Sequence, residues 1–195
     1  MTAPAAPAHS HASEPSPWIV RFAPLVAPDA RVLDLAAGHG RHARFLAARG
    51  ARVVAVDRDA TALAGLAGIA RVEVRVLDLE SGAWPFADER FDAIVVTNYL
   101  HRPSFAPLLA ALADDGVLLY ETFARGNEAY GRPSNPDFLL ERDELLQLAQ
   151  RRLTVIAFEQ GVVERPLPGA VVQRLAAVGP ARPWPPALPP PLRPH

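Results

Sequence analysis

The stretch that most constrains the fold of this chain is RVLDLAAGHGRHARFLAARG, residues 31–50. A hydrophobic segment leads through a glycine turn into a segment with its apolar residues at helical spacing. This order predicts a buried strand followed by a helix, with a ligand site at the carboxyl end of the strand. Gly38 and Gly40 let the backbone approach that ligand closely. The helix that begins near Arg41 directs its first amides toward the same place.

The rest of the chain continues the alternation of strand and helix. Strands are predicted over 30–36, 51–57, 72–78, 91–98, 116–123, 153–164 and 169–179, and helices over 16–26, 41–50, 59–70, 104–114 and 137–152. The middle strands are nearly continuous apolar runs, which is typical of a parallel sheet covered on both faces. The connection between the last two strands is too short for a helical crossover, so they should pair as a hairpin. The predicted fold class is α/β: a Rossmann-like, doubly wound, seven-stranded sheet, mostly parallel, with a C-terminal antiparallel strand hairpin.

The length of 195 residues favours one domain, predicted over residues 16–179. A small, Pro-rich and polar segment at 1–15 and a Pro-dense segment at 180–195 are predicted to be disordered tails. The C-terminal tail is interpreted as a spacer, with weak recruitment of a proline-reading partner as the alternative. No apolar run approaches the roughly 20 residues that span a bilayer. The first residues also lack the pattern of a signal peptide, so we expect a cytoplasmic protein with no membrane partner.

Composition removes several kinds of chemistry. The chain has no cysteine and no lysine, which excludes disulfides, a thiolate nucleophile and a lysine Schiff base. The formal net charge of −1 gives no basic excess and disfavours nucleic acid as a partner. His39 and His42 in the glycine turn have no cluster of Cys or carboxylate residues beside them, so no metal site is expected.

The glycine turn is compatible with two kinds of ligand. Gly38, Gly40 and Ala43 fit the dinucleotide fingerprint, with Asp57 at the end of the second strand to hold a ribose hydroxyl. However, Asp34 immediately precedes the turn, and its carboxylate would repel a pyrophosphate. A ligand with a cationic head would be attracted. S-adenosylmethionine carries an ammonium group and a sulfonium and no phosphate, so Asp34 favours it over a dinucleotide.

The segment DLAAGHG resembles the first motif of the class I S-adenosylmethionine-dependent methyltransferases, an acidic residue followed by alternating glycines. Ala36 stands where the first glycine of the motif usually lies. The resemblance covers about residues 16–179, including the terminal strand hairpin. The longer segment from Ala37 through Asp59 is similar to a small bacterial branch that includes tellurite-resistance-type methyltransferases. The stretch from Tyr120 to Leu146 also resembles a motif of small bacterial members.

The resemblance implies S-adenosylmethionine as cofactor, with S-adenosylhomocysteine as product, and a role for each matching position. Residues expected to line the methionine part are Asp34, Ala36, Gly38 and Gly40. Those expected around the ribose and adenine are Asp57, Arg58, Asp78 and Leu79, and Asn98 is expected next to the sulfonium methyl. An acidic residue at a strand end can instead cap a following helix, and this alternative stays open for Asp57 and Asp78.

Methyl transfer is an in-line displacement whose rate depends mainly on how the protein positions the acceptor relative to the methyl group. A catalytic residue is therefore not required. The candidates for a base or for methyl-proximal contacts are Tyr99, His101 and Glu121. The candidates for substrate contact are Arg102 and four members of the long polar loop after the fifth strand, Asn127, Glu128, Tyr130 and Arg132. A helix-capping or surface pair is the alternative for His101 and Arg102, and a self-packed surface loop is the alternative for the others.

Absences narrow the substrate. Family members that methylate exocyclic amines of bases carry Asn/Asp-Pro-Pro-aromatic after the fourth strand, where this chain has NYLH. We therefore expect an enzyme that methylates a small molecule. A tRNA or protein substrate stays open because arginine pairs such as Arg151–Arg152 could form a local binding face. A non-catalytic adenosyl-ligand binding module and a dinucleotide-dependent oxidoreductase are the remaining alternatives.

Overall fold

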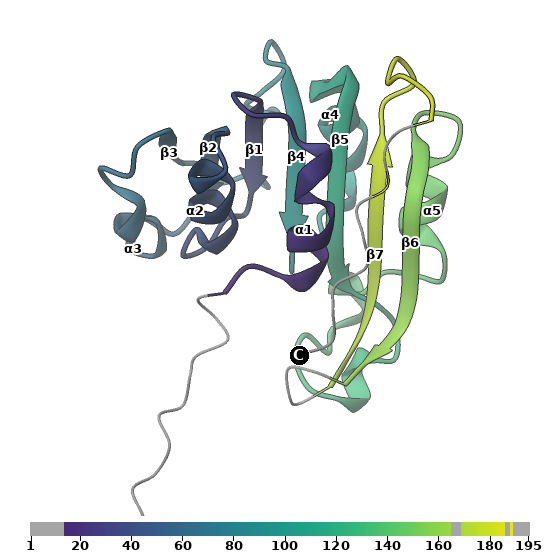
Figure 1. The fold of residues 1–195 in the computed structure, drawn as a ribbon. Coiled ribbons are helices and arrows are strands. Elements are labelled where there is room, and N and C mark those ends of the chain that lie inside the picture. Colours follow the sequence, from purple (N-terminus) through teal and green to yellow (C-terminus); the bar gives the residue numbers. More distant parts are fainter. Residues whose placement is uncertain (1–13, 165–168, 186–187, 189–195) are drawn as a thin grey trace, which may run out of the picture.

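The computed structural model describes residues 14–164, 169–185 and 188. Its strands are β1 (Arg31–Leu35), β2 (Arg52–Asp57), β3 (Val72–Val76), β4 (Phe91–Thr97), β5 (Leu112–Phe123), β6 (Thr154–Val163) and β7 (Ala170–Val178). They form one seven-stranded sheet in the order β3-β2-β1-β4-β5-β7-β6 (Figure 1). β1 to β5 are parallel, and β7 runs antiparallel to both β5 and β6. The predicted fold class, including the terminal hairpin, is confirmed.

Two of the predicted segments fall largely outside the part of the chain that the structure describes. Of the tail predicted at 1–15, only Glu14 and Pro15 are described, and of the tail at 180–195, only 180–185 and 188. Within the described ranges, no helix combines the length and the apolar character needed to cross a membrane.

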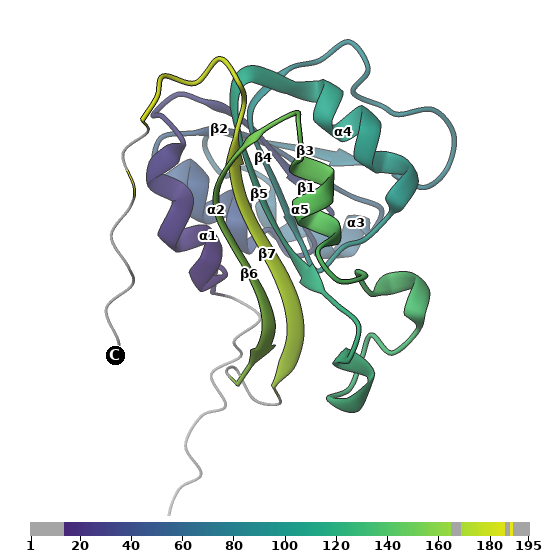
Figure 2. The same ribbon diagram turned by 90° about the vertical axis from the view of Figure 1, so that its right-hand side faces the viewer.

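The helices are α1 (Pro17–Phe22), α2 (Arg41–Ala48), α3 (Ala60–Leu63), α4 (Phe105–Ala111) and α5 (Glu144–Ala149). Figure 2 shows α1 and α2 on one side of the sheet and α4 and α5 on the other. Successive strand residues point to opposite faces, so Val32 packs in the cluster under α1 and α2, whereas Leu33 packs in the cluster under α4 and α5. The burial of both faces explains the continuous apolar runs of β1, β2 and β4.

The first helix is joined to the sheet by a buried polar network. Ser16 caps α1, since its Oγ accepts from the amide of Trp18 at 3.1 Å. The Ser16 amide donates to Nε2 of the buried His42 at 3.1 Å. Because Nε2 accepts, the ring proton lies on Nδ1, which can donate to Oγ1 of Thr97 at 3.3 Å. Burial lowers the pKa of His42 to about 3, with a smaller contribution from Arg41, so the ring is neutral and anchors α1.

The predicted helix over 137–152 is wrong for its first half. Leu140 forms an isolated parallel bridge with Ala124, and its amide donates to the carbonyl of Phe123 at 3.0 Å. Residues Pro136–Phe138 form only a 3₁₀ turn, and Leu140 then finds its backbone partner at the end of β5 and not in an α-helix. Asp143 then adopts a left-handed φ of 62°, and α5 begins at the next residue.

Other boundaries also differ from the prediction. The helix predicted at 59–70 is α-helical only to Leu63 and continues as a 3₁₀ turn (Ala64–Leu66), ahead of Gly68 with its φ of 77°. β5 begins at Leu112, so the last three residues of the helix predicted at 104–114 belong to this strand. β3 is shorter than predicted and, as an edge strand, is largely exposed.

Candidate functional site

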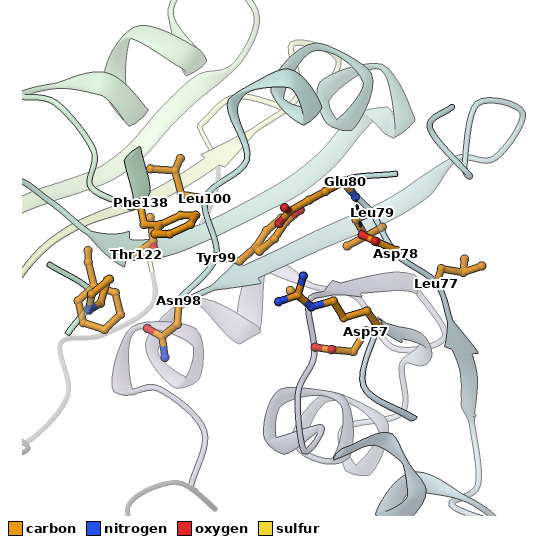
Figure 3. Close-up of a pocket in the computed structure, with 14 residues that line it drawn as sticks. Asp57, Leu77, Asp78, Leu79, Glu80, Asn98, Tyr99, Leu100, Thr122 and Phe138 are labelled. Carbon is orange, nitrogen blue, oxygen red and sulfur yellow. Dashed lines mark hydrogen bonds between the residues drawn. The ribbon is translucent and has the colours of Figure 1, made fainter. Parts of the chain in front are cut away.

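Two neighbouring cavities open at the carboxyl ends of the parallel strands. The first has a volume of about 440 Å³ and lies over the ends of β1, β2 and β4. Among its lining residues are six of the predicted cofactor residues: Ala36, Asp57, Arg58, Asp78, Leu79 and Asn98 (Figure 3). The second has a volume of about 340 Å³ and lies between α1, the loop after β5 and the strands β5 and β7. Asn98 and Phe123 line both cavities, so the cavities meet there.

Asp57 at the end of β2 is positioned by the glycine turn. Its Oδ2 accepts from the amide of Gly38 at 2.8 Å, and its Oδ1 accepts from the amide of Asp59 at 3.0 Å. A carboxylate oxygen can accept two hydrogen bonds, so each oxygen keeps one lone pair for a ligand. A fixed, half-buried carboxylate with two such lone pairs is suited to a pair of vicinal hydroxyl groups.

Ala36 and Asn98 have left-handed backbones at the ends of the adjacent strands β1 and β4. Their φ angles are 55° and 54°, a region that costs a non-glycine residue roughly 1–2 kcal/mol. Ala36 thus keeps the conformation that the expected glycine would adopt. The amide of Asn98 is fixed by the carbonyl of Glu121 at 2.9 Å. Strained residues of this kind cluster at functional sites, and here they mark the part of the first cavity nearest the second.

The two glycines of the turn have different tasks. Gly40 has a φ of 72°, and a Cβ atom there would lie 2.4 Å from Cδ1 of the buried Leu66. Gly38 has a φ of 52°, and a Cβ atom there would meet nothing within 4 Å. Gly40 is therefore required for packing. Gly38 borders open space and contributes its amide to Asp57.

Asp34 lies beneath the turn and lines neither cavity. Its side chain is buried, and Oδ2 has no hydrogen-bond partner among the described residues. Burial raises the pKa of Asp34 to about 7, against the lowering effects of the Ala43 amide and Arg41, and Asp57 adds to the rise. Asp34, predicted from the sequence to line the methionine part of the site, is therefore absent from the lining of both cavities.

The raised pKa of Asp34 predicts a pH-dependent stability. Between pH 3.8 and about 7 the folded protein holds a proton on Asp34 that the unfolded chain has lost. Its contribution to the free energy of unfolding is therefore complete below pH 4 and declines as the pH rises to 7. We therefore expect wild type to lose stability relative to Asp34→Asn as the pH rises from 4 to 7. Urea denaturation of both proteins at each pH measures this change in relative unfolding free energy. The lowered pKa of His42 makes the unfolding free energy rise with pH, but it does so in both proteins and cancels in the comparison. A difference between the two proteins that does not change with pH would contradict the raised pKa of Asp34.

Asp78, Leu79 and Tyr99 form the far end of the first cavity. Asp78 closes a turn, since its Oδ1 accepts from the amide of Glu80 at 3.0 Å, and it lines the cavity as well. In Figure 3, Tyr99 lies between Asn98 on one side and Glu80 on the other. Burial, followed by the charges of Glu80 and Asp78, holds the pKa of the Tyr99 phenol well above its usual value. Tyr99 is therefore a hydroxyl donor at neutral pH and is unsuited to act as a base.

Some of the predicted residues of the loop after β5 line the second cavity, and one does not. Tyr130 and Arg132 line it as predicted. Asn127 also lines it, but its side chain holds the loop together. Its Nδ2 donates to the carbonyl of Pro133 at 2.9 Å, and its Oδ1 accepts from the amide of Val171 at 3.1 Å. Glu128 lies on neither cavity and accepts from the amide of Gly126.

Glu121 lines the second cavity at the end of β5. Its Oε1 accepts from Oγ of Ser16 at 2.9 Å. Its Oε2 lies 2.6 Å from Nε of Arg174, an ion pair outside the angles of a hydrogen bond. A second carboxylate, that of Glu159, lies 3.6 Å from Nη1 of Arg174 and also pairs with Arg21. Glu121 is thus a charged, oriented side chain in the floor of this cavity.

His101 and Arg102 line neither cavity. Nδ1 of His101 lies 2.7 Å from Oγ of Ser104 in the turn before α4. Arg102 forms a bidentate pair with Glu144, at 2.7 and 2.9 Å. It also donates to the carbonyls of Asp137 and Leu139, each at 2.9 Å. With these partners, Arg102 joins α5 and the segment before it to the end of β4.

These contacts predict that Arg102→Ala affects stability and not ligand binding. Loss of the bidentate pair and the carbonyl contacts should lower the unfolding free energy by about 1–2 kcal/mol, a value reduced for the partial exposure of the guanidinium. The affinity for a ligand of the first cavity should stay unchanged. Urea denaturation and calorimetry measure the two quantities. Unchanged stability together with lost acceptor turnover would instead support the substrate role predicted from the sequence.

Several cavity residues were missed by the sequence interpretation. Arg41 lines the second cavity from the first position of α2, and its place directly after the glycine turn was the signal for it. Arg174 reaches Glu121 because the antiparallel register places these residues opposite each other, which the sequence does not specify. Phe123 lines the first cavity from the end of β5, and Phe138 lines it from the 3₁₀ turn at Pro136–Phe138, within the segment whose α-helix prediction was wrong.

Comparisons with known proteins agree with this architecture. Residues 32–114 match the family model described as a methyltransferase domain. A demethylmenaquinone methyltransferase from Clavibacter sepedonicus is 42% identical over 118 residues, which cover 55% of this chain and 47% of that protein. The chain therefore spans about half the length of this curated relative.

Solved structures show the same fold. TehB from Haemophilus influenzae superposes with a TM-score of 0.68 at 19% identity, over 83% of this chain and 61% of that one. The 1,6-didemethyltoxoflavin-N1-methyltransferase of Burkholderia thailandensis, solved with bound S-adenosylhomocysteine, has a TM-score of 0.62 at 24% identity. That match covers 84% of this chain and 76% of the other. At these identities the likeness establishes the fold.

Proposed function

From the premise that this chain carries a class I S-adenosylmethionine-dependent methyltransferase domain, we propose that it methylates a small molecule held in the second cavity. The observation that carries the proposal is the contact between the two cavities at Asn98 and Phe123. A donor in one cavity and an acceptor in the other would approach each other at this junction, as an in-line transfer requires.

The first cavity fits S-adenosylmethionine by its charges and hydrogen-bonding groups. Its lining has three carboxylates, those of Asp57, Asp78 and Glu80, against the single cation of Arg58. This excess of negative charge suits a ligand with a sulfonium and an ammonium group and no phosphate. The two open lone pairs of Asp57 suit the ribose hydroxyls. We assign the adenine to the end formed by Asp78 and Leu79.

When bound, S-adenosylmethionine supplies a methyl group on a good leaving group, with the bonding electrons left on sulfur. The residues of this chain then have to orient the acceptor and exclude water. Asn98, fixed by the carbonyl of Glu121, shapes the junction. Glu121 can accept the proton that a hydroxyl or amine acceptor loses on methylation. An acceptor that is already ionised needs no base.

A small-molecule acceptor is supported by the size of the second cavity and by the names of similar proteins. A volume of about 340 Å³ is within the range of small-ligand sites. The demethylmenaquinone and didemethyltoxoflavin methyltransferases are both named for ring-shaped small molecules. The shared fold does not by itself transfer their substrates to this chain.

Calorimetry with S-adenosylhomocysteine, with NADH as the control, tests the cofactor. We expect the former to bind with a dissociation constant on the order of micromolar and NADH not to bind. A methyl-transfer assay with a panel of small ring acceptors then tests the reaction. Binding of NADH alone would refute the proposal, and binding of S-adenosylhomocysteine without transfer to any acceptor would favour a non-catalytic binding module.

A further inference from the structure

The two cavities carry opposite charges. Whereas acidic residues dominate the first, the charged residues that line the second are three arginines, Arg41, Arg132 and Arg174, and one carboxylate, Glu121, within the described part of the chain. A ligand of the second cavity therefore meets an excess of positive charge.

This excess is concentrated on two of the arginines. Arg174 is neutralised by its close ion pair with Glu121 and by Glu159. Among the described residues, the side chain of Arg41 forms one hydrogen bond, from Nη1 to the uncharged carbonyl of Glu14 at 3.2 Å. Arg132 is exposed and forms no ion pair with the residues described. Arg41 and Arg132 are thus the cations that an anionic ligand can pair with.

The two cations belong to different parts of the cavity wall. Arg41 starts α2 directly after the glycine turn and lines the cavity together with Ser16 and Pro17 of the α1 region. Arg132 lies in the loop after β5, two residues from Tyr130. Tyr130 and Phe123 are the aromatic members of the lining, and Val172 adds an aliphatic surface. The second cavity therefore combines a cation with aromatic and aliphatic surfaces suited to a planar ring.

We propose that the second cavity selects a small aromatic acceptor bearing a carboxylate, and that Arg132 determines this specificity by pairing with the carboxylate. The inference rests on the proposed function and names the substrate class for the same site. A guanidinium binds a carboxylate in a bidentate manner, which gives orientation as well as affinity. The amino-acid end of the cofactor would extend from the junction at Asn98 into the edge of the second cavity, where Arg41, next to the glycine turn, would pair with its carboxylate.

Matched acid and amide probes test the proposal. The probes are 4-hydroxybenzoate and indole-3-carboxylate, each with its neutral amide, titrated by calorimetry into protein saturated with S-adenosylhomocysteine. Wild type should bind each acid about tenfold more tightly than its amide, since a hydrogen bond to a charged group is worth about this factor. Arg132→Gln should abolish the preference and leave the affinity for S-adenosylhomocysteine unchanged. Arg142→Gln, an exposed arginine that lines neither cavity, is the control and should keep the preference.

A second pair of ligands distinguishes binding of the acceptor's carboxylate from binding of the cofactor's carboxylate. Arg41→Gln should weaken S-adenosylhomocysteine by about tenfold and leave 5′-methylthioadenosine, which lacks the amino-acid end, unaffected. Equal binding of acids and amides to wild type would overturn the proposal. So would retention of the preference in Arg132→Gln, or failure of both acids to bind at about millimolar concentration. Failure of wild type to bind S-adenosylhomocysteine would instead count against the proposed function.

Discussion

Replacing Asp57 with asparagine is expected to weaken the binding of S-adenosylhomocysteine by about 10- to 100-fold, or roughly 1.5–3 kcal/mol, the value of hydrogen bonds to a charged group. The carboxylate of Asp57 is held by the amides of Gly38 and Asp59 with one open lone pair on each oxygen. An asparagine keeps one acceptor oxygen and introduces an NH₂ group that would face an amide donor or a ribose hydroxyl. The loss should therefore exceed that of one neutral hydrogen bond.

The matched control for this variant is Asp88→Asn, which removes one negative charge from an exposed position outside both cavities. Its affinity for S-adenosylhomocysteine should equal that of wild type. Calorimetry at constant ionic strength gives both values. If Asp57→Asn binds as tightly as wild type, the ribose is not held at the end of β2, and the alternative that Asp57 only supports the turn would be preferred.

Gly40→Ala is expected to cause the largest loss of stability among the changes considered, about 2–4 kcal/mol. Two costs combine at this position. The φ of 72° is unfavourable for any residue with a Cβ atom, and that atom would lie 2.4 Å from the fully buried side chain of Leu66. Gly38→Ala shares the positive φ but meets no neighbour within 4 Å, so it should cost only about 1–2 kcal/mol.

A double-mutant cycle separates the two costs at Gly40. In a Leu66→Ala background the close contact is removed, and Gly40→Ala should then cost about 1–2 kcal/mol, the backbone contribution alone. Urea denaturation of the four proteins gives the coupling free energy. Additive effects of the two substitutions would show that Leu66 moves aside without cost, and the packing role assigned to Gly40 would be wrong.

The fold could be predicted from the sequence because its signals are local. Continuous apolar runs identified the buried strands, and the glycine turn placed the site at the end of β1. The short connection between the last strands predicted their antiparallel pairing. The errors arose where tertiary contacts override helical periodicity. Leu139 and Leu140 have helical spacing with the leucines of α5, yet their backbone is held by β5 and by Arg102.

The site was predictable where one strand end determines it and not where two distant segments meet. The positions of Asp57, Asp78 and Asn98 on the first cavity follow from the strand ends alone. The pairing of Glu121 with Arg174 depends on the register between β5 and β7. Arg102 lines neither cavity and instead pairs with Glu144, which lies 42 residues away in the sequence. Neither relation leaves a pattern in a single sequence.

A crystal structure of the complex with S-adenosylhomocysteine would test the central claim most directly. We expect the ribose hydroxyls on the carboxylate of Asp57 and the adenine beside Asp78 and Leu79. The sulfur should lie at Asn98, where the first cavity meets the second. A nucleoside bound elsewhere, or a sulfur atom directed away from the second cavity, would contradict the assignment of donor and acceptor to these two cavities.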